Sequence, residues 1–355
     1  MRARSIASEA YRNLASGTTR ALLLAIALAT VGAGLAIADA RSVVTMERRA
    51  AEFVSSGASV RVMVARKTTD AAACERLGGI PGVRSAGALR ETEPVVLRAM
   101  AGNPIQAYAV TPGLIEVLGG VPAASAGAWL PAQLAETLGV RPGAELATGG
   151  GTLTVAGVYH YPDDGRDSRL HHAALLPQPA AGTFDECWAD IWPFSEARDS
   201  LLHTAFTVDA GSSDPVTIGQ LNTRLGTRFD GLGEFAGRPT RYAPHGCALA
   251  GLVLGFLAVR MRRLEIAGAL HLGQSRRSLL ATHLIETAAW SSAALLLAAA
   301  ALVFGVVLGD TADPGSVYLI DIRGPVAATL AAHAGAVLAL ATIRERHLFG
   351  YFKNR

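Results

Sequence analysis

The chain has 355 residues and a net charge of +3, which is too small to indicate binding to nucleic acid. Its residues are 50% hydrophobic and only 17% charged, whereas soluble domains usually carry about a quarter charged residues. With a mean hydropathy of +0.31, the composition is typical of a membrane protein and argues against an ordinary soluble domain.

Four stretches are apolar enough for membrane-spanning helices, each of which needs about 20 mainly apolar residues. We predict the spans at residues 21–40, 243–259, 287–308 and 325–343. Residues 41–242 contain no such stretch and form a stalk and one large domain outside the membrane. The chain is therefore predicted to be an integral membrane protein that carries this domain between its first and second spans.

The distribution of charge predicts the orientation. Arginine and lysine are concentrated at 1–20, 260–286 and 344–355, whereas the short loop at 309–324 is acidic, with Asp310, Asp313 and Asp321. Basic loops remain in the cytoplasm. We therefore predict a multi-pass protein of the cell membrane, with both termini, the 260–286 loop and the 344–355 tail in the cytoplasm and the large domain outside.

The end of the first span has two interpretations. Ala38-Asp39-Ala40 resembles the cleavage site of a signal peptide, but the apolar core before it is longer than usual for one. We favour a retained anchor. Good helix formers then continue without Gly or Pro until Gly57, which predicts that the helix extends beyond the membrane as a stalk.

The large domain shows mixed signals that predict an α+β fold but leave the strand order open. Alternating or β-branched runs predict strands at 59–65, 82–89, 94–100, 105–110 and 152–160. Helices are predicted after Asp70 and at 111–118, 131–138 and about 217–225. Residues 163–200 are rich in Pro, Asp and aromatic residues, and we expect them to be irregular.

No catalytic or cofactor site is apparent in the sequence. The histidines at 160, 171 and 172 and the aspartates at 163, 164 and 167 match no zinc signature, so we interpret them as a solvated loop. The glycine run at 149–151 lacks the lysine of a phosphate-binding loop and precedes a strand. We therefore expect no metal, no cofactor and no enzymatic activity in this chain.

The cysteines leave one question open. Cys74 and Cys187 both lie in the large domain, where an oxidising compartment would permit a disulfide, but two cysteines alone do not establish one. Cys247 lies in the second span and is expected to be a buried apolar residue.

Glycine pairs four residues apart occur in two spans, at Gly251 and Gly255 and at Gly305 and Gly309. Such pairs permit close packing of membrane helices. Chance occurrence in alanine-rich spans explains them equally well.

The 260–286 loop contains signals for two helices. A short helix begins near Arg262 and ends at Leu272-Gly273, since glycine is the preferred residue after a helix C-terminus. Ser275 can cap a second, amphipathic helix that leads through Glu286 into the third span. At the membrane surface, Glu286 is expected to pair with a nearby arginine.

This loop resembles that of the permease domain of MacB/FtsX-type ABC transporters. The matching residues are Arg262, Arg263, Glu265, Ile266, Leu272, Gly273, Ser275 and Glu286, whereas Leu270, His271 and Gln274 depart from the pattern. In the large domain, residues 110–113, 127–130, 138–143 and 155–158 resemble the periplasmic core of this family. The order of one helix, a large domain and three helices is also that of the family.

The resemblance implies a permease subunit that works as a dimer, with a second copy or a paralogue, in the lipid bilayer. A separate cytoplasmic ABC ATPase would bind the loop, and hydrolysis would reshape the outer domain to export or extract an amphiphilic substrate such as a peptide, lipid, lipoprotein or drug. The alternative is an FtsX-like signalling scaffold that activates an external cell-wall hydrolase. Nucleic acid is not expected as a partner.

Overall fold

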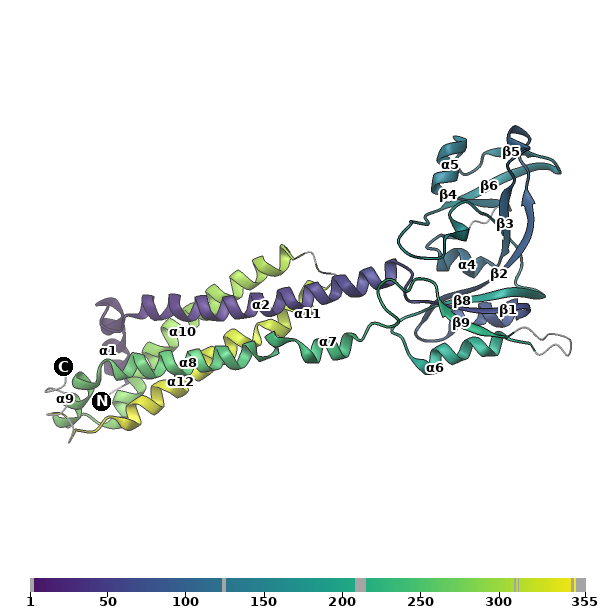
Figure 1. The fold of residues 1–355 in the computed structure, drawn as a ribbon. Helices are drawn as coiled ribbons and strands as arrows, with labels where there is room; N and C mark the ends of the chain where they lie inside the picture. Colours follow the sequence, from purple (N-terminus) through teal and green to yellow (C-terminus); the bar gives the residue numbers. More distant parts are fainter. Residues whose placement is uncertain are drawn as a thin grey trace. The chain divides into compact units, whose positions relative to one another are not determined.

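The computed structural model describes residues 3–122, 126–207, 215–309, 311, 313–345 and 348 (Figure 1). It divides into two compact units. The helical unit comprises Met1–Arg49 and Gly231–Arg355, and the inserted domain comprises Ala50–Asp230. Asp310 and most of the predicted basic tail lie outside the described residues.

Four helical stretches within the described residues are long and apolar enough to cross a membrane. They are α2 (Ala21–Ser55), α8 (Ala243–Arg260) with the 3-10 turn Pro239–Tyr242 before it, α10 (Arg276–Val307), and α11 (Pro314–Asp321) followed by α12 (Arg323–Thr342). The inserted domain lies between the first and second of them. This confirms the predicted fold class of a multi-pass membrane protein with an inserted α+β domain.

Shorter helices complete the helical unit. They are α1 (Ala3–Ala15), α7 (Gly231–Gly237) and α9 (Arg263–His271). The segment that we expected to be a short loop contains α11. The carboxylate of Asp313 accepts a hydrogen bond of 3.1 Å from the Ser316 amide, and Pro314 occupies the first turn, where its missing N–H is harmless.

Helix α2 is continuous to Ser55, as the absence of helix breakers predicted. Gly57 follows with a φ of +76°, a left-handed conformation that side chains disfavour. This glycine therefore allows the chain to leave the helix and enter the sheet of the inserted domain.

Helices α8 and α12 lie side by side and pack closely through glycine (Figure 1). A Cβ atom added at Gly251 would lie 2.0 Å from the carbonyl oxygen of Ala328, and one at Gly255 would lie 1.9 Å from that of Ala332. The first predicted pair therefore forms a real packing contact. We did not predict a similar contact at Gly335 of α12. A Cβ atom added there would lie 2.1 Å from the carbonyl oxygen of Leu252.

The second pair behaves differently. The atom nearest to a Cβ added at Gly305 belongs to the side chain of Ile37 on α2, at 3.2 Å. Gly309 lies beyond the end of α10, and a Cβ there would approach the carbonyl oxygen of Val306 in its own turn. The atoms of a neighbouring helix nearest to either added Cβ belong to side chains, so this pair does not show the backbone contact of the first pair.

The described residues of the inserted domain form a nine-stranded sheet. Its strands are β1 (Val60–Asp70), β2 (Val83–Val95), β3 (Ile105–Val110), β4 (Ala128–Pro131), β5 (Glu145–Thr148), β6 (Gly151–Tyr159), β7 (Ala174–Pro177), β8 (Thr183–Ile191) and β9 (Thr217–Gln220). Their order is β5-β6-β4-β7-β3-β2-β8-β1-β9. Helices α3 (Ala71–Arg76), α4 (Pro112–Val117), α5 (Ala132–Leu138) and α6 (Glu196–Asp199) complete the α+β domain.

Three sequence predictions for this domain are corrected. The stretch expected to be irregular contains β7 and the central strand β8, which pairs with both β1 and β2. The helix expected near residues 217–225 is the edge strand β9, which pairs with β1. The strands expected at 82–89 and 94–100 are one strand, β2, followed by a 3-10 turn at Arg98–Met100.

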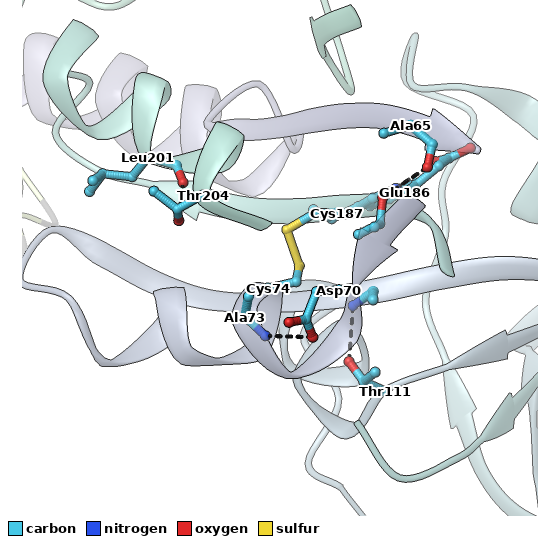
Figure 2. The surroundings of a disulfide bond; sticks show 12 residues. Ala65, Asp70, Ala73, Cys74, Thr111, Glu186, Cys187, Leu201 and Thr204 are labelled. Atoms are coloured by element: carbon cyan, nitrogen blue, oxygen red, sulfur yellow. Dashed lines mark hydrogen bonds between the residues drawn. A yellow bond between two sulfur atoms is a disulfide. The ribbon is translucent and has the colours of Figure 1, made fainter. Parts of the chain in front are cut away.

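A disulfide joins Cys74 of α3 to Cys187 of β8 (Figure 2). Both residues are fully buried in the apolar cluster on one face of the sheet. Asp70 fixes the start of α3, because its carboxylate accepts hydrogen bonds from the amides of Ala72 and Ala73, at 2.9 and 3.2 Å. The structure thus resolves the open question in favour of the bridge.

Candidate coupling site in the loop between α8 and α10

The loop between α8 and α10 folds as its capping signals predicted. Gly273 has a φ of +85°, and its amide donates to the carbonyl oxygen of Leu270 at 3.0 Å. This closes the C-terminus of α9. The Ser275 hydroxyl accepts a hydrogen bond of 3.2 Å from the Ser278 amide and caps α10. The two caps define α9 as a separate short helix.

Arg262 connects α9 to α10. Its Nε and Nη2 donate to the two carboxylate oxygens of Glu265, at 2.8 and 2.5 Å, and its Nη1 donates to Glu286 of α10 at 2.6 Å. Only 9% of the Arg262 side chain and 5% of the Glu286 side chain are exposed. Such charge-assisted hydrogen bonds are short and roughly twice as strong as neutral ones. The arginine partner that we expected for Glu286 is therefore Arg262.

Two further side chains complete the environment of Glu286. Asn13 of α1 donates a hydrogen bond of 2.7 Å to its Oε1, and Nδ1 of His283 lies 3.3 Å from its Oε2. Glu286 thus joins the N-terminal helix, the start of α9 and its own helix. We define the Glu286 network as Asn13, Arg262, Glu265, His283 and Glu286.

Arg262 keeps its positive charge although its side chain is buried. Burial alone would lower its pKa, but the hydrogen bond to Glu265 and the charges of Glu286 and Glu265 raise it above the usual value. Removing one member of a buried ion pair costs about 3–5 kcal/mol, because the other charge remains buried without a partner. The orientation of α9 therefore depends on this pair.

The predicted coupling residues divide into an internal and an external group. Arg262 is internal, and Ile266, with 1% exposure, lies in an apolar cluster with Val259 and Leu279. Arg263 is half-buried and engaged in an interaction. Glu265, Leu272, Gly273 and Ser275 are exposed at the surface of the loop.

The exposed group contains one large apolar residue, Leu272. Leu272 has 88% of its surface exposed, and it lies directly beside the glycine that ends α9. The side chain of Glu265 is 53% exposed although one face of it binds Arg262. We define the α9 surface as Glu265, Leu272, Gly273 and Ser275.

Sequence reasoning missed Asn13. We treated residues 1–20 as a basic lead-in and gave this asparagine no role. It lies 273 positions from Glu286, and an isolated asparagine gives no sequence signal for a contact over that distance.

In the inserted domain, a second set of contacts holds the end of α2. Arg166 donates to both carboxylate oxygens of Asp164, at 2.9 and 2.7 Å, and to the carbonyl oxygen of Ser55 at 3.1 Å. Asn222 donates to the carbonyl oxygen of Ser56 at 2.9 Å. Burial alone would raise the pKa of Asp164, but the hydrogen bonds and charge of Arg166 outweigh this effect and lower it.

A cavity of about 790 Å³ borders these contacts within the inserted domain. Its wall combines apolar residues, including Val60, Leu118 and Leu221, with the charged pair Arg84 and Asp190. The wall also carries Glu116, His160 and Arg166, so it is more polar than the mainly apolar lining that is typical of ligand pockets.

The histidines near Asp163 form no metal site in the described part of the chain, where no three His, Cys, Asp or Glu side chains are close enough to hold an ion. His171 instead packs edge-on against Tyr161, with ring centroids 5.3 Å apart. Its Nε2 lies 3.3 Å from the carbonyl oxygen of Pro162. His171 is therefore half-buried against Tyr161, whereas we expected it in a solvated loop.

No protein-family model and no curated protein matches the sequence. Among solved structures, the chain is similar to the periplasmic region of MacB from Actinobacillus actinomycetemcomitans, with 11% identity, a TM-score of 0.35, and coverage of 49% of this chain and 94% of that one. It is also similar to a domain of a putative permease protein from Porphyromonas gingivalis, with 15% identity, a TM-score of 0.34, and coverage of 47% and 92%. Four long apolar helices with an α+β domain between the first and second are the architecture that the resemblance to MacB/FtsX-type permeases implies.

Proposed function

We propose that the chain is the permease subunit of an ABC transporter complex and that a separate ATPase subunit docks on the α9 surface. In this proposal, ATP hydrolysis by that subunit changes the conformation of the inserted domain, which exports or extracts an amphiphilic substrate. The chain itself is not the enzyme. A second copy or a paralogue completes the membrane part, and α9 and both termini face the cytoplasm.

The observation that supports the proposal is the way α9 is held. A helix of 9 residues that is clamped by a buried ion pair, yet ends in a highly exposed leucine, is suited to receive a force from a partner. Protein interfaces combine an apolar centre with a polar rim, and the α9 surface offers both kinds of group.

The same network offers a route for the signal. A displacement of α9 acts on Glu286 of α10 through Arg262, and on α1 through Asn13. Helix α2 continues from the helical unit to Ser55, where Arg166 and Asn222 hold the chain. In this proposal, a motion of α2 acts on the inserted domain at Ser55 and Ser56, where these two side chains contact the chain.

A site-specific cross-link tests the docking. Cysteine is introduced by Leu272→Cys, a photoreactive maleimide is attached, and the complex is irradiated in native membranes. We expect an adduct with an ABC ATPase, identified by mass spectrometry from the phosphate-binding loop in its sequence. Leu232→Cys, at a leucine of α7 that is 85% exposed, is the matched control and should give no such adduct. Equal adducts from both positions, or none from Leu272→Cys, would reject the docking surface.

A further inference from the structure

A second buried ionic cluster lies in the helical unit, far along α2 from the residues near α9. Asp39 of α2 accepts hydrogen bonds from Arg238, at 2.8 Å from Nε and 3.4 Å from Nη2. Arg238 also donates to the carbonyl oxygen of Phe235 at 2.7 Å, and its guanidinium lies 3.7 Å from the centre of the Phe235 ring. This pair joins α2 to the segment that precedes α8.

Asp321, the last residue of α11, adds a second carboxyl group to this cluster. It is 3% exposed, and neither of its carboxylate oxygens has a hydrogen-bond donor among the described residues. The Asp39 and Asp321 carboxyl groups are close enough to influence each other's charge, and both side chains are buried beside the apolar cluster that contains Ala36, Ala40 and Val317. A buried carboxylate without a donor is costly, and two facing carboxylates cannot both be ionised at low cost.

Among the described residues around this cluster, no further positive charge faces the two carboxyl groups. From the segment before α8, Arg238 donates to Asp39, and the buried hydroxyl of Thr240 lies nearby without a hydrogen-bond partner of its own among the described residues. The described residues of α10 that pack here are Leu302 and Val306, and α11 adds Val317 and the ring of Tyr318. Arg41 and Arg323, the nearest arginines in sequence, are exposed. Two carboxyl groups therefore share one guanidinium.

We propose that Asp321 carries a proton, donates it in a hydrogen bond to Asp39, and so holds α11 against α2. The proton neutralises the second carboxyl group and supplies the missing donor in one step. A metal ion would not serve, because hard cations take six or more oxygen ligands and this cluster has two carboxyl groups. The proposal does not depend on the docking of an ATPase.

The site makes the α11 end of the helical unit sensitive to alkaline pH. While the proton is bound, the cluster is neutral overall. When it is released, two facing carboxylates remain beside one guanidinium, and their repulsion separates α11 from α2.

Infrared difference spectroscopy of the full chain in nanodiscs tests the proposal. Near neutral pH, we expect a carbonyl stretching band of a protonated carboxylic acid that disappears as the pH is raised. Asp321→Asn, which has the shape of the protonated acid, should remove this band. Asp313→Asn is the matched control, since it changes the exposed aspartate at the start of the same helix and asparagine also caps helices. It should leave the band unchanged.

Thermal unfolding supplies an independent readout. The melting temperature of the wild-type chain should fall as the pH is raised from neutral to alkaline, whereas that of Asp321→Asn should not follow this fall. A band that persists in Asp321→Asn, or equal pH profiles for the two chains, would overturn the proposal. A failure of Asp321→Asn to fold would also overturn it, because the amide replaces a neutral group of the same shape.

Discussion

Arg166 donates a hydrogen bond of 3.1 Å to the carbonyl oxygen of Ser55, the last residue of α2, while the same guanidinium binds the carboxylate of Asp164. Only 7% of the Arg166 side chain is exposed, so these contacts are shielded from water. The end of the longest helix in the chain is therefore held by a specific side chain of the inserted domain.

Replacing this side chain should loosen the end of α2. In Arg166→Ala, the Ser55 carbonyl loses a donor and Asp164 loses its charge partner, at a cost of about 1–3 kcal/mol for each group left without a partner. We expect faster amide hydrogen exchange at residues 56–58, measured by mass spectrometry. Arg98→Ala is the control, because Arg98 is exposed and donates to Thr148 elsewhere in the domain. Unchanged exchange in Arg166→Ala would show that this contact does not hold the helix.

The lowered pKa of Asp164 predicts an acid dependence of the same contact. Because the folded-state pKa lies below the unfolded value of about 3.9, the stabilisation is complete above that value and is lost as the pH falls through the folded-state pKa. Protection of residues 56–58, corrected for intrinsic exchange rates, should therefore decrease on acidification. Asp164→Asn should be less protected at neutral pH and respond less to acid. A wild-type acid profile in Asp164→Asn would contradict the assignment.

The contact between α8 and α12 predicts a steric effect of a single methyl group. In Gly255→Ala, the new Cβ would lie 1.9 Å from the carbonyl oxygen of Ala332, so the helices must separate. Overpacking of this kind typically costs about 1–3 kcal/mol. Gly34→Ala in α2 is the control, since a Cβ there meets no atom within 4 Å and alanine favours the helix. Circular dichroism should show a lower melting temperature for the first variant and an unchanged or higher one for the second. Equal melting temperatures would contradict the packing.

The disulfide predicts a large effect in the inserted domain. It links residues 113 positions apart, and loss of such a bridge typically costs about 2–5 kcal/mol. The double variant Cys74→Ala/Cys187→Ala should unfold at lower urea concentration than the wild type, followed by tryptophan fluorescence. Thiol labelling of the unreduced, denatured wild-type chain is the control and should modify Cys247 alone. Labelling of all three cysteines would show that no bridge forms.

The helical unit could be predicted well because its signals are local. The length of an apolar stretch predicts a membrane span. A glycine in the left-handed conformation ends a helix, and a capping serine begins one, through contacts within a single turn. Gly273 and Ser275 therefore defined α9 correctly. Gly335 and Asn13 were not predicted, because their importance depends on which distant residue lies opposite them.

The inserted domain could be predicted less well for the same reason. Strand β8 carries the buried acids Glu186 and Asp190 and the half-buried Asp185, which hid the apolar pattern of an interior strand. These buried carboxylates are tolerated because arginines from other segments of the chain form ion pairs with them. Arg169 donates two hydrogen bonds to Glu186, at 2.5 and 2.7 Å, and Arg84 lies 3.5 Å from Asp190. No local pattern in β8 indicates these partners.

Docking of an ATPase on the α9 surface is the central claim, and ATP hydrolysis by the reconstituted complex in nanodiscs tests it most directly. Leu272→Asp should reduce hydrolysis to the rate of the isolated ATPase subunit, because a charge replaces the most exposed apolar side chain of that surface. Leu232→Asp, the matched change on α7, should retain the wild-type rate. A wild-type rate in Leu272→Asp, with normal membrane insertion, would contradict the claim.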